Sequence, residues 1–189
     1  MKRVLLIRGS ARQGSYTNAI ADRALASQEG IAVTAFSPYE VAFAPCDGCN
    51  FCEEAGRCRH GDLTDLARAF ATCDVILIAA PVYNGGFPAP VKALLDRTQV
   101  YYTGFYANGK HPLIKKHRRV VLLAASGCDG SRALGVMADQ LHAICSVTNA
   151  ELTGTALCPH TDGAPDPETA YKTLCELLKR SLSDEETNR

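Results

Sequence analysis

The sequence contains no long apolar run. The first apolar segment, Val4–Ile7, stops at Arg8, too early for the hydrophobic core of a signal peptide. No stretch approaches the roughly 20 apolar residues that cross a bilayer. We therefore expect no membrane-spanning segment, no membrane partner and a cytoplasmic location.

Net charge is also lacking, because 20 Lys and Arg residues balance 20 Asp and Glu residues. Proteins that bind nucleic acid generally present an excess of basic side chains, so we expect no nucleic-acid partner. The 47% hydrophobic content of the 189 residues is ordinary for one globular domain. We expect that domain to span residues 1–182, with a Cys-rich insertion at 43–60 and a frayed tail at 183–189.

What the chain does have is an alternation of short apolar runs with amphipathic segments. The clearest run is Val75–Ala80, which is typical of a strand buried on both faces. Asp62 is placed to cap a following helix, and the segment 38–60 is expected to be irregular. Strands that alternate with helices predict an α/β fold with a doubly wound parallel sheet. The expected strands are 4–7, 31–36, 75–80, 120–125 and 151–157, and the expected helices are 16–27, 63–71, 89–98, 131–146 and 167–181.

Three polar loops follow the carboxyl ends of expected strands, where open parallel sheets bind ligands. The first loop, 9–18, ends where a helix begins, so its free amides and the positive helix end attract an anion. It has neither the Gly-Lys-Ser/Thr sequence of a Walker loop nor the Gly-x-Gly-x-x-Gly spacing of dinucleotide folds. Its side chains suit a phosphate monoester, although a plain turn capped by hydroxyls is the alternative: Ser10, Arg12, Ser15, Thr17 and Asn18.

The second and third loops, 81–88 and 126–131, suit a flat ligand. Gly85 and Gly86 allow the backbone to approach such a ligand closely, while Tyr83 or Phe87 pack nearby. The alternative interpretation of the second loop is a turn with two core aromatic residues. Together the three loops predict one binding site.

Three segments resemble the NADPH-dependent FMN reductase family: Gly9-Ser10-x-Arg12, Pro81-Val82-Tyr83 and Lys92–Arg97. The resemblance covers about residues 1–130. It implies a flavodoxin-like, five-stranded parallel sheet with strand order 2-1-3-4-5. It also implies bound FMN, NAD(P)H as electron donor, and a homodimer or homotetramer in which a neighbour helps to enclose the flavin.

The resemblance also implies roles for individual residues. Ala11 departs from the proline that the family often has, and the absence of tryptophan means that no Trp can stack on the flavin. The implied phosphate ligands are Ser10, Arg12, Ser15, Thr17 and Asn18. The residues implied at the isoalloxazine ring are Pro81, Val82, Tyr83, Asn84 and Gly85 on one side and Ser126 and Gly127 on the other.

Four of the nine cysteines form a close cluster, Cys46, Cys49, Cys52 and Cys58. Thiolates at this spacing can surround one cubane cluster, and Gly48 and Gly56 supply turns. The cluster resembles that of the iron–sulfur flavoprotein branch of the family, which implies a [4Fe–4S] centre. Zinc, a redox disulfide or reactive thiol, and a loop without metal remain alternatives.

Two further segments have both a structural and a functional interpretation. The basic stretch 110–119 is either a solvated approach to a strand or a site for the 2′-phosphate of NADPH. The aromatic run Tyr101–Tyr106 is expected outside any periodic element, either in the core or as an exposed patch at a subunit interface or flavin lid.

The function that follows from the resemblance is electron transfer from NAD(P)H through FMN. The acceptor is a small molecule, such as a quinone or flavin, or the [4Fe–4S] centre. Because the cofactor carries the chemistry, we expect no catalytic acid or base. Two alternatives stay open: an electron carrier that docks redox proteins without reacting with nicotinamide, and a non-enzymatic thiol- or metal-binding protein of the same fold.

Overall fold

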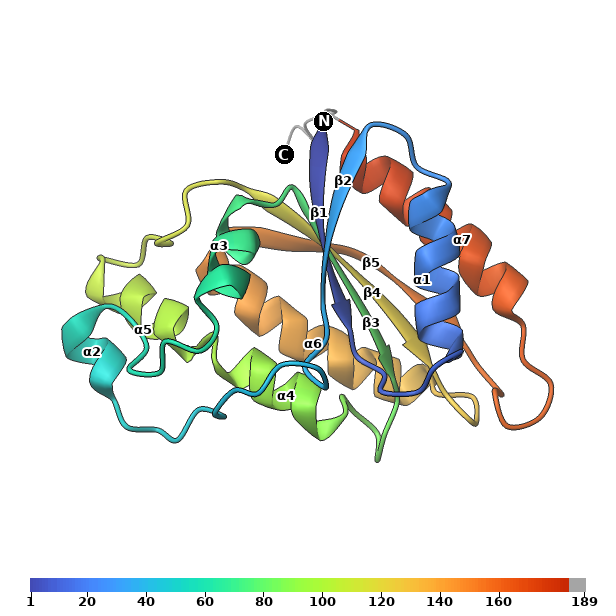
Figure 1. Ribbon diagram of the computed structural model, residues 1–189, viewed down its shortest axis with the longest axis horizontal. Coiled ribbons are helices and arrows are strands. Elements are labelled where there is room, and N and C mark those ends of the chain that lie inside the picture. The colour runs from blue at the N-terminus through green and yellow to red at the C-terminus, as the bar shows by residue number, and fades with distance from the viewer. Residues whose placement is uncertain (184–189) are drawn as a thin grey trace.

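A computed structural model describes residues 1–183. Its five strands form one parallel sheet in the order β2-β1-β3-β4-β5, as Figure 1 shows. This flavodoxin-like arrangement confirms the fold that the sequence predicts. The strands are β1 (Lys2–Arg8), β2 (Ile31–Phe36), β3 (Val75–Pro81), β4 (Arg118–Ala125) and β5 (Ala150–Cys158).

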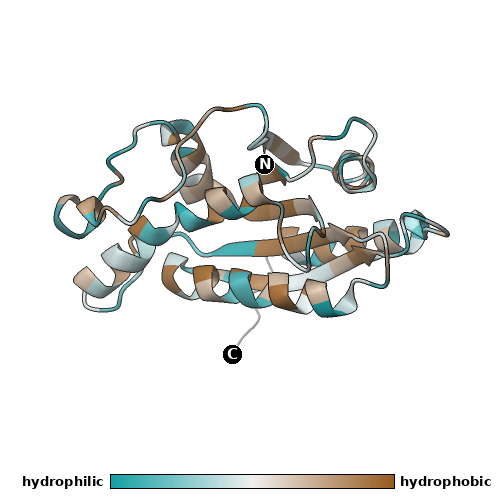
Figure 2. Ribbon diagram, turned by 90° about the horizontal axis from the view of Figure 1, so that it is seen from below, coloured by the Kyte–Doolittle hydropathy of each residue, from teal (hydrophilic) through white to brown (hydrophobic). Residues whose placement is uncertain are grey.

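Successive side chains of a strand point to opposite faces of the sheet, so the apolar strands present apolar side chains on both faces. Helices cover both of these faces. One apolar core joins β1, β3 and β4 to α1 and α7, and a second core joins the same strands to α3, α4 and α6. Figure 2 shows the central strands in the brown of hydrophobic residues, whereas the helices mix brown and teal. The helices are α1 (Tyr16–Ala26), α2 (Phe51–Ala55), α3 (Thr64–Thr72), α4 (Ala89–Asp96), α5 (Gln99–Ala107), α6 (Ser131–Thr148) and α7 (Pro167–Leu182). Within residues 1–183, no helix has the length and apolar character needed to span a membrane.

Three expectations about local structure are wrong. The aromatic run Tyr101–Tyr106 lies in the helix α5, where Gly104 gives room for Leu113: a Cβ on Gly104 would lie 2.9 Å from Leu113 Cγ. Asp62 does not cap α3, whose N-cap position is Leu63 without a side-chain hydrogen bond. The short helix α2 also lies inside the segment that was expected to be irregular. Of the tail that was expected to be frayed, 183–189, residues 184–189 lie outside the described residues.

The basic stretch serves the fold at the amino end of β4, at the sheet edge away from the polar loops. Arg118 is fully buried, and its guanidinium donates to the carbonyls of Phe70, at 2.7 Å, and Thr148. The Phe70 carbonyl lies in the last turn of α3 and the Thr148 carbonyl in the last turn of α6. The negative end of each helix dipole lies there and stabilises a cation. Lys116 pairs with Asp74 at 2.7 Å. The structure therefore places this stretch away from the polar loops and favours its structural interpretation.

Candidate functional site

The loops that follow β1, β3, β4 and β5 meet at the carboxyl edge of the sheet, toward the lower right of Figure 1. They enclose a cavity of about 350 Å³, which lies in the range of small-molecule sites. We refer to residues 9–15, 82–88, 126–130 and 159–166 as the β1, β3, β4 and β5 loops. The cavity is lined by Ser10, Arg12, Gln13, Gly14, Ser15, Tyr16, Thr17, Pro81, Val82, Tyr83, Ala125, Gly127, Thr161 and Asp162.

The β1 loop presents hydrogen-bond donors and a cation at the start of α1. Ser15 is the N-cap, and its Oγ accepts from the Asn18 amide at 3.2 Å and lies 3.3 Å from Thr17 Oγ1. The first amides of α1 have no intrahelical acceptor. They point out of the end of the helix that borders the cavity. Arg12 is exposed and forms no ion pair with any of residues 1–183. These groups can bind a dianionic phosphate ester.

Gly9 brings the β1 loop against β3. Its amide donates to the Ala79 carbonyl at 2.7 Å. A Cβ at this position would lie 2.6 Å from Ala80 Cβ and 2.9 Å from the Ala79 oxygen. Only glycine permits this approach, which places the anion-binding loop beside Pro81 at the end of the neighbouring strand.

The β3 loop folds into a tight hairpin turn. The backbones of Tyr83 and Gly86 exchange two hydrogen bonds of 3.0 Å, and the central residues Asn84 and Gly85 have φ values of 49° and 78°. This Asn-Gly pair matches the type I′ turn that closes two-residue hairpins. Asn84 and Gly85 shape the turn and do not line the cavity, whereas Tyr83 lines the cavity and is 42% exposed.

Of the two predicted site residues in the β4 loop, only one lines the cavity. Gly127 lines the cavity, but Ser126 is buried and positions the loop: its amide donates to Cys158 and its carbonyl accepts from Thr161, at 3.0 and 2.9 Å. Asn18 also lies outside the cavity lining, and its side-chain amide donates to the Ser10 carbonyl at 3.4 Å. Both residues support the loops that form the cavity.

Sequence reasoning missed the β5 loop. Thr161 and Asp162 line the cavity from this loop, and Gln13, Gly14, Tyr16 and Ala125 complete the lining. The signal was present, because the β5 loop follows the carboxyl end of the last expected strand, as the other three loops follow theirs. Asp162 places a carboxylate in a cavity whose cation is Arg12.

The four clustered cysteines line one small cavity of about 40 Å³ at the other side of the molecule, beside α2 and α5. Helix α2 rests on α5, with Cys52 Sγ 3.6 Å from Thr103 Oγ1. Four thiols are a suitable donor set for an iron–sulfur cluster or zinc. In residues 1–183, however, no three His, Cys, Asp or Glu side chains converge closely enough to hold a metal ion.

The sequence from residue 2 to residue 154 matches the family described as NADPH-dependent FMN reductase. This chain belongs to the NADPH-dependent FMN reductase family. The resemblance that the loop motifs carry is thereby confirmed, and the match reaches beyond them into β5.

Two curated relatives of this family member are archaeal iron–sulfur flavoproteins. The one from Methanocaldococcus jannaschii is 33% identical over 111 residues, which cover 57% of this chain and 58% of the relative. The one from Methanosarcina thermophila is 34% identical over 95 residues, 49% of this chain and 50% of the relative. The chain thus spans only about half of the length of each of these curated relatives.

Solved structures share the fold of this family member at low sequence identity. An FMN-dependent NADH-azoreductase from Bacillus anthracis, in complex with FMN, matches with a TM-score of 0.71 and 17% identity, covering 96% of this chain and all of that one. An NAD(P)H:quinone oxidoreductase from Methanothermobacter marburgensis matches with a TM-score of 0.70 and 15% identity, covering 99% and 96%.

Proposed function

We propose that this protein is an FMN-dependent NAD(P)H oxidoreductase that passes electrons to a small acceptor, such as a quinone or free flavin, or to a [4Fe–4S] centre in its cysteine loop, residues 44–62. One observation carries the proposal: the anion-binding start of α1 and the Tyr83 turn border the same cavity. A phosphate ester joined to a flat ring fits such a cavity. Family membership and the FMN-bound structural relative support the choice of FMN.

The residues that would hold FMN divide by chemistry. Arg12 supplies charge, and the hydroxyls of Ser10, Ser15 and Thr17 supply hydrogen bonds for the phosphate. Pro81, Val82, Tyr83 and Gly127 would flank the ring, with Asn18, Asn84, Gly85 and Ser126 holding the loops in place. When bound, FMN supplies hydride acceptance and electron release, while the protein binds and orients it.

The exposed Tyr83 ring suggests how a second molecule reaches the cavity. Tyr83 is 42% exposed at the cavity edge, so this aromatic residue offers a surface for a nicotinamide or for a planar acceptor. No side chain needs to move a proton in this scheme, so we assign no catalytic acid or base.

We propose that the cysteine loop holds the [4Fe–4S] centre through Cys46, Cys49, Cys52 and Cys58. The shared cavity of these thiols and the names of the curated relatives support this assignment. When bound, the centre would take single electrons. Its binding would draw the thiols together, since they do not converge on one metal position within the described residues.

We also propose that the protein forms a homodimer or homotetramer. Tyr102 and Tyr106 of α5 and Val136 of α6 are 47%, 52% and 43% exposed. Aromatic and apolar side chains are enriched at interfaces between subunits. Light scattering on the purified protein would distinguish a monomer, which contradicts this proposal, from an assembly.

The activity is tested by mixing anaerobically purified, FMN-loaded protein with NADPH or NADH. We expect the flavin absorbance to bleach with at least one of the two and to return when a quinone is added. A flavin that neither nicotinamide bleaches would overturn the oxidoreductase proposal and support an electron carrier. Protein that binds zinc through its thiols and does not bind FMN would support the non-enzymatic alternative.

A further inference from the structure

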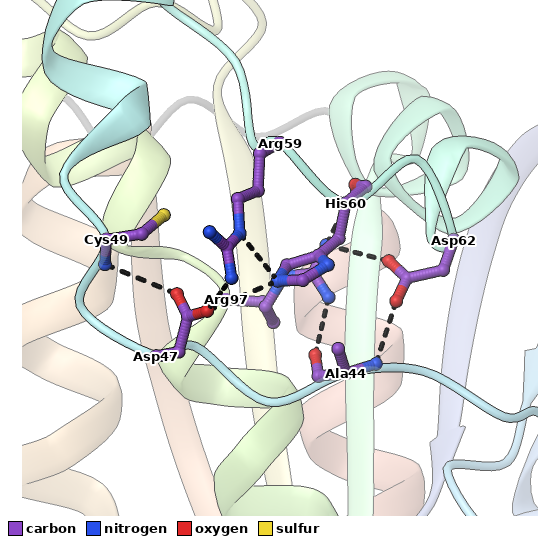
Figure 3. Close-up of polar contacts among 7 residues, drawn as sticks. All are labelled: Ala44, Asp47, Cys49, Arg59, His60, Asp62 and Arg97. Atoms are coloured by element: carbon purple, nitrogen blue, oxygen red, sulfur yellow. Dashed lines mark hydrogen bonds and ion pairs between the residues drawn. The ribbon is translucent and has the colours of Figure 1, made fainter.

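The cysteine loop, residues 44–62, is closed across its base by one arginine (Figure 3). Arg97 ends helix α4 and is only 9% exposed. Its Nη1 donates to the Ala44 carbonyl at 2.6 Å, and its Nη2 donates to the His60 carbonyl at 3.1 Å and to Asp62 Oδ1 at 2.8 Å. One side chain therefore joins Ala44, two positions before the first clustered cysteine, to two residues that follow the last.

Asp62 completes this closure. Its second oxygen, Oδ2, accepts from the Ala44 amide at 2.8 Å, so both backbone groups of Ala44 are held. The Arg97 guanidinium keeps the pKa of the Asp62 carboxyl below its ordinary value. This pairing explains why Asp62 does not cap α3, since its oxygens are already used by the loop.

A second contact joins the two halves of the loop nearer to the cysteines. Asp47 accepts from the Cys49 amide at 3.2 Å and pairs with the Arg59 guanidinium. The Arg59 Nε lies 3.3 Å from the His60 ring nitrogen Nε2. These side chains are about half exposed, so their ion pair contributes less than the nearly buried one of Arg97.

Arg97 also faces the cysteine cavity. It lines the cavity together with all four clustered thiols, and its buried Nε has no hydrogen-bond partner in residues 1–183. Arginine keeps its positive charge in proteins. The guanidinium is thus a permanent positive charge that borders the same cavity as Cys58, and its Nε donor is unused.

We propose that Arg97 is the positioning residue of the cysteine loop: it closes the loop before any metal binds, and its charge makes the reduction potential of a centre held there more positive. The second part rests on the proposed [4Fe–4S] centre. Net charge and hydrogen bonds near the sulfurs set the potentials of such centres, and a cation favours the more negative, reduced form. The first part distinguishes this loop from metal sites that are unfolded without metal.

The closure is tested on metal-free protein by hydrogen exchange of the peptides that cover residues 44–62. Arg97→Met removes the charge and the donors, whereas Arg97→Lys keeps the charge but cannot reach three acceptors. Asp62→Asn should have a smaller effect on exchange than Arg97→Met. We expect exchange in this loop to rise at least about tenfold in Arg97→Met, with β3 and β4 still protected. Arg68→Met, at an exposed arginine of α3, is the matched control and should exchange as wild type does. Equal exchange in wild type and Arg97→Met would overturn the positioning role.

The charge effect is tested after anaerobic reconstitution with iron and sulfide, by a spectroscopic redox titration. We expect a more negative potential in Arg97→Met and a potential near wild type in Arg97→Lys, a pattern that a merely structural role would not produce. Equal potentials in Arg97→Met and wild type would overturn the charge effect. If wild type forms no cluster, the cluster assignment falls and the charge effect with it, while the exchange experiment still decides whether Arg97 closes the loop.

Discussion

The carboxylate of Asp162 lies directly against the α-carbon of Gly127. A Cβ at position 127 would lie 2.8 Å from Asp162 Cγ and closer still to Oδ2. Both residues line the larger cavity, so the β4 and β5 loops meet at this contact in the proposed flavin site.

Gly127→Ala should therefore weaken FMN binding more than it weakens the fold. Asp162 is exposed and its flexible side chain can move away, so we expect the free energy of unfolding to change by less than about 1 kcal/mol. The displaced carboxylate should reduce FMN affinity by about tenfold, which is about 1.4 kcal/mol, in a flavin fluorescence titration. Gly135→Ala is the control, because a Cβ there meets nothing within 4 Å. An unchanged affinity in Gly127→Ala would place the ring away from this contact.

Gly9→Ala should damage the fold and the site together. The added methyl group would meet Ala80 Cβ at 2.6 Å and backbone at 2.9 Å, and neither neighbour can rotate away. We expect a loss of about 1–3 kcal/mol of unfolding free energy, measured with urea, and weaker FMN binding. A variant as stable as wild type would show that the β1 loop does not need this close approach to β3.

Arg118→Met should be among the most destabilising single changes. The substitution leaves the partly buried carbonyl of Phe70 and the buried carbonyl of Thr148 without the guanidinium donors. We expect a loss of about 2–5 kcal/mol of unfolding free energy, against less than about 0.5 kcal/mol for Arg68→Met at an exposed position. Similar losses in the two variants would contradict the structural role of the buried cation.

The fold was predictable from the sequence because its determinants are local. The apolar runs around Val75–Ala80 and Val120–Ala125 are central strands buried on both faces, and such runs have few other interpretations. Ser15, the N-cap of α1, is likewise a local signal, because serine is a preferred residue at helix N-termini. The loops that follow such strands could therefore be placed at one edge of the sheet.

The remaining features depend on contacts between residues far apart in the chain. Arg97 reaches Ala44 and Asp62, 53 and 35 residues away, so nothing near Asp62 reveals that its carboxylate is committed to the cysteine loop. Leu113 packs over Gly104 in the helix that contains Tyr101–Tyr106, a contact that the aromatic run alone does not reveal. In the sequence, Arg118 belongs to a basic stretch that could be solvated. Only the structure shows that carbonyls at the ends of two helices bind its guanidinium.

Buried and exposed thiols should differ sharply in reactivity. Burial raises the pKa of Cys73 and Cys145 to about 11, despite the nearby Arg118 charge. At pH 8 these thiols stay protonated in the folded protein, so an alkylating reagent should label the exposed Cys128 and spare both. Mass spectrometry of peptides locates the label, and urea should make all sites reactive. Rapid labelling of Cys145 in folded protein would contradict its burial.

The same two thiols give a pH dependence of stability. Their folded pKa of about 11 lies above the roughly 8.5 of an unfolded thiol, so the folded state keeps protons that the unfolded chain releases. The stabilisation is complete below about pH 8.5 and is lost as the pH rises toward 11. Cys73→Ala should flatten this decline in urea titrations between these values, and an unchanged slope would exclude this origin.

The most direct test of the account compares the affinities of FMN and riboflavin, which differ only in the phosphate that the β1 loop is proposed to bind. We expect wild-type protein to bind FMN at least about 100-fold more tightly, because several charge-assisted hydrogen bonds are involved. Arg12→Gln should reduce this ratio by about tenfold, and Arg68→Gln should leave it unchanged. Equal binding of the two flavins, or binding of neither, would contradict the proposal that this cavity is an FMN site.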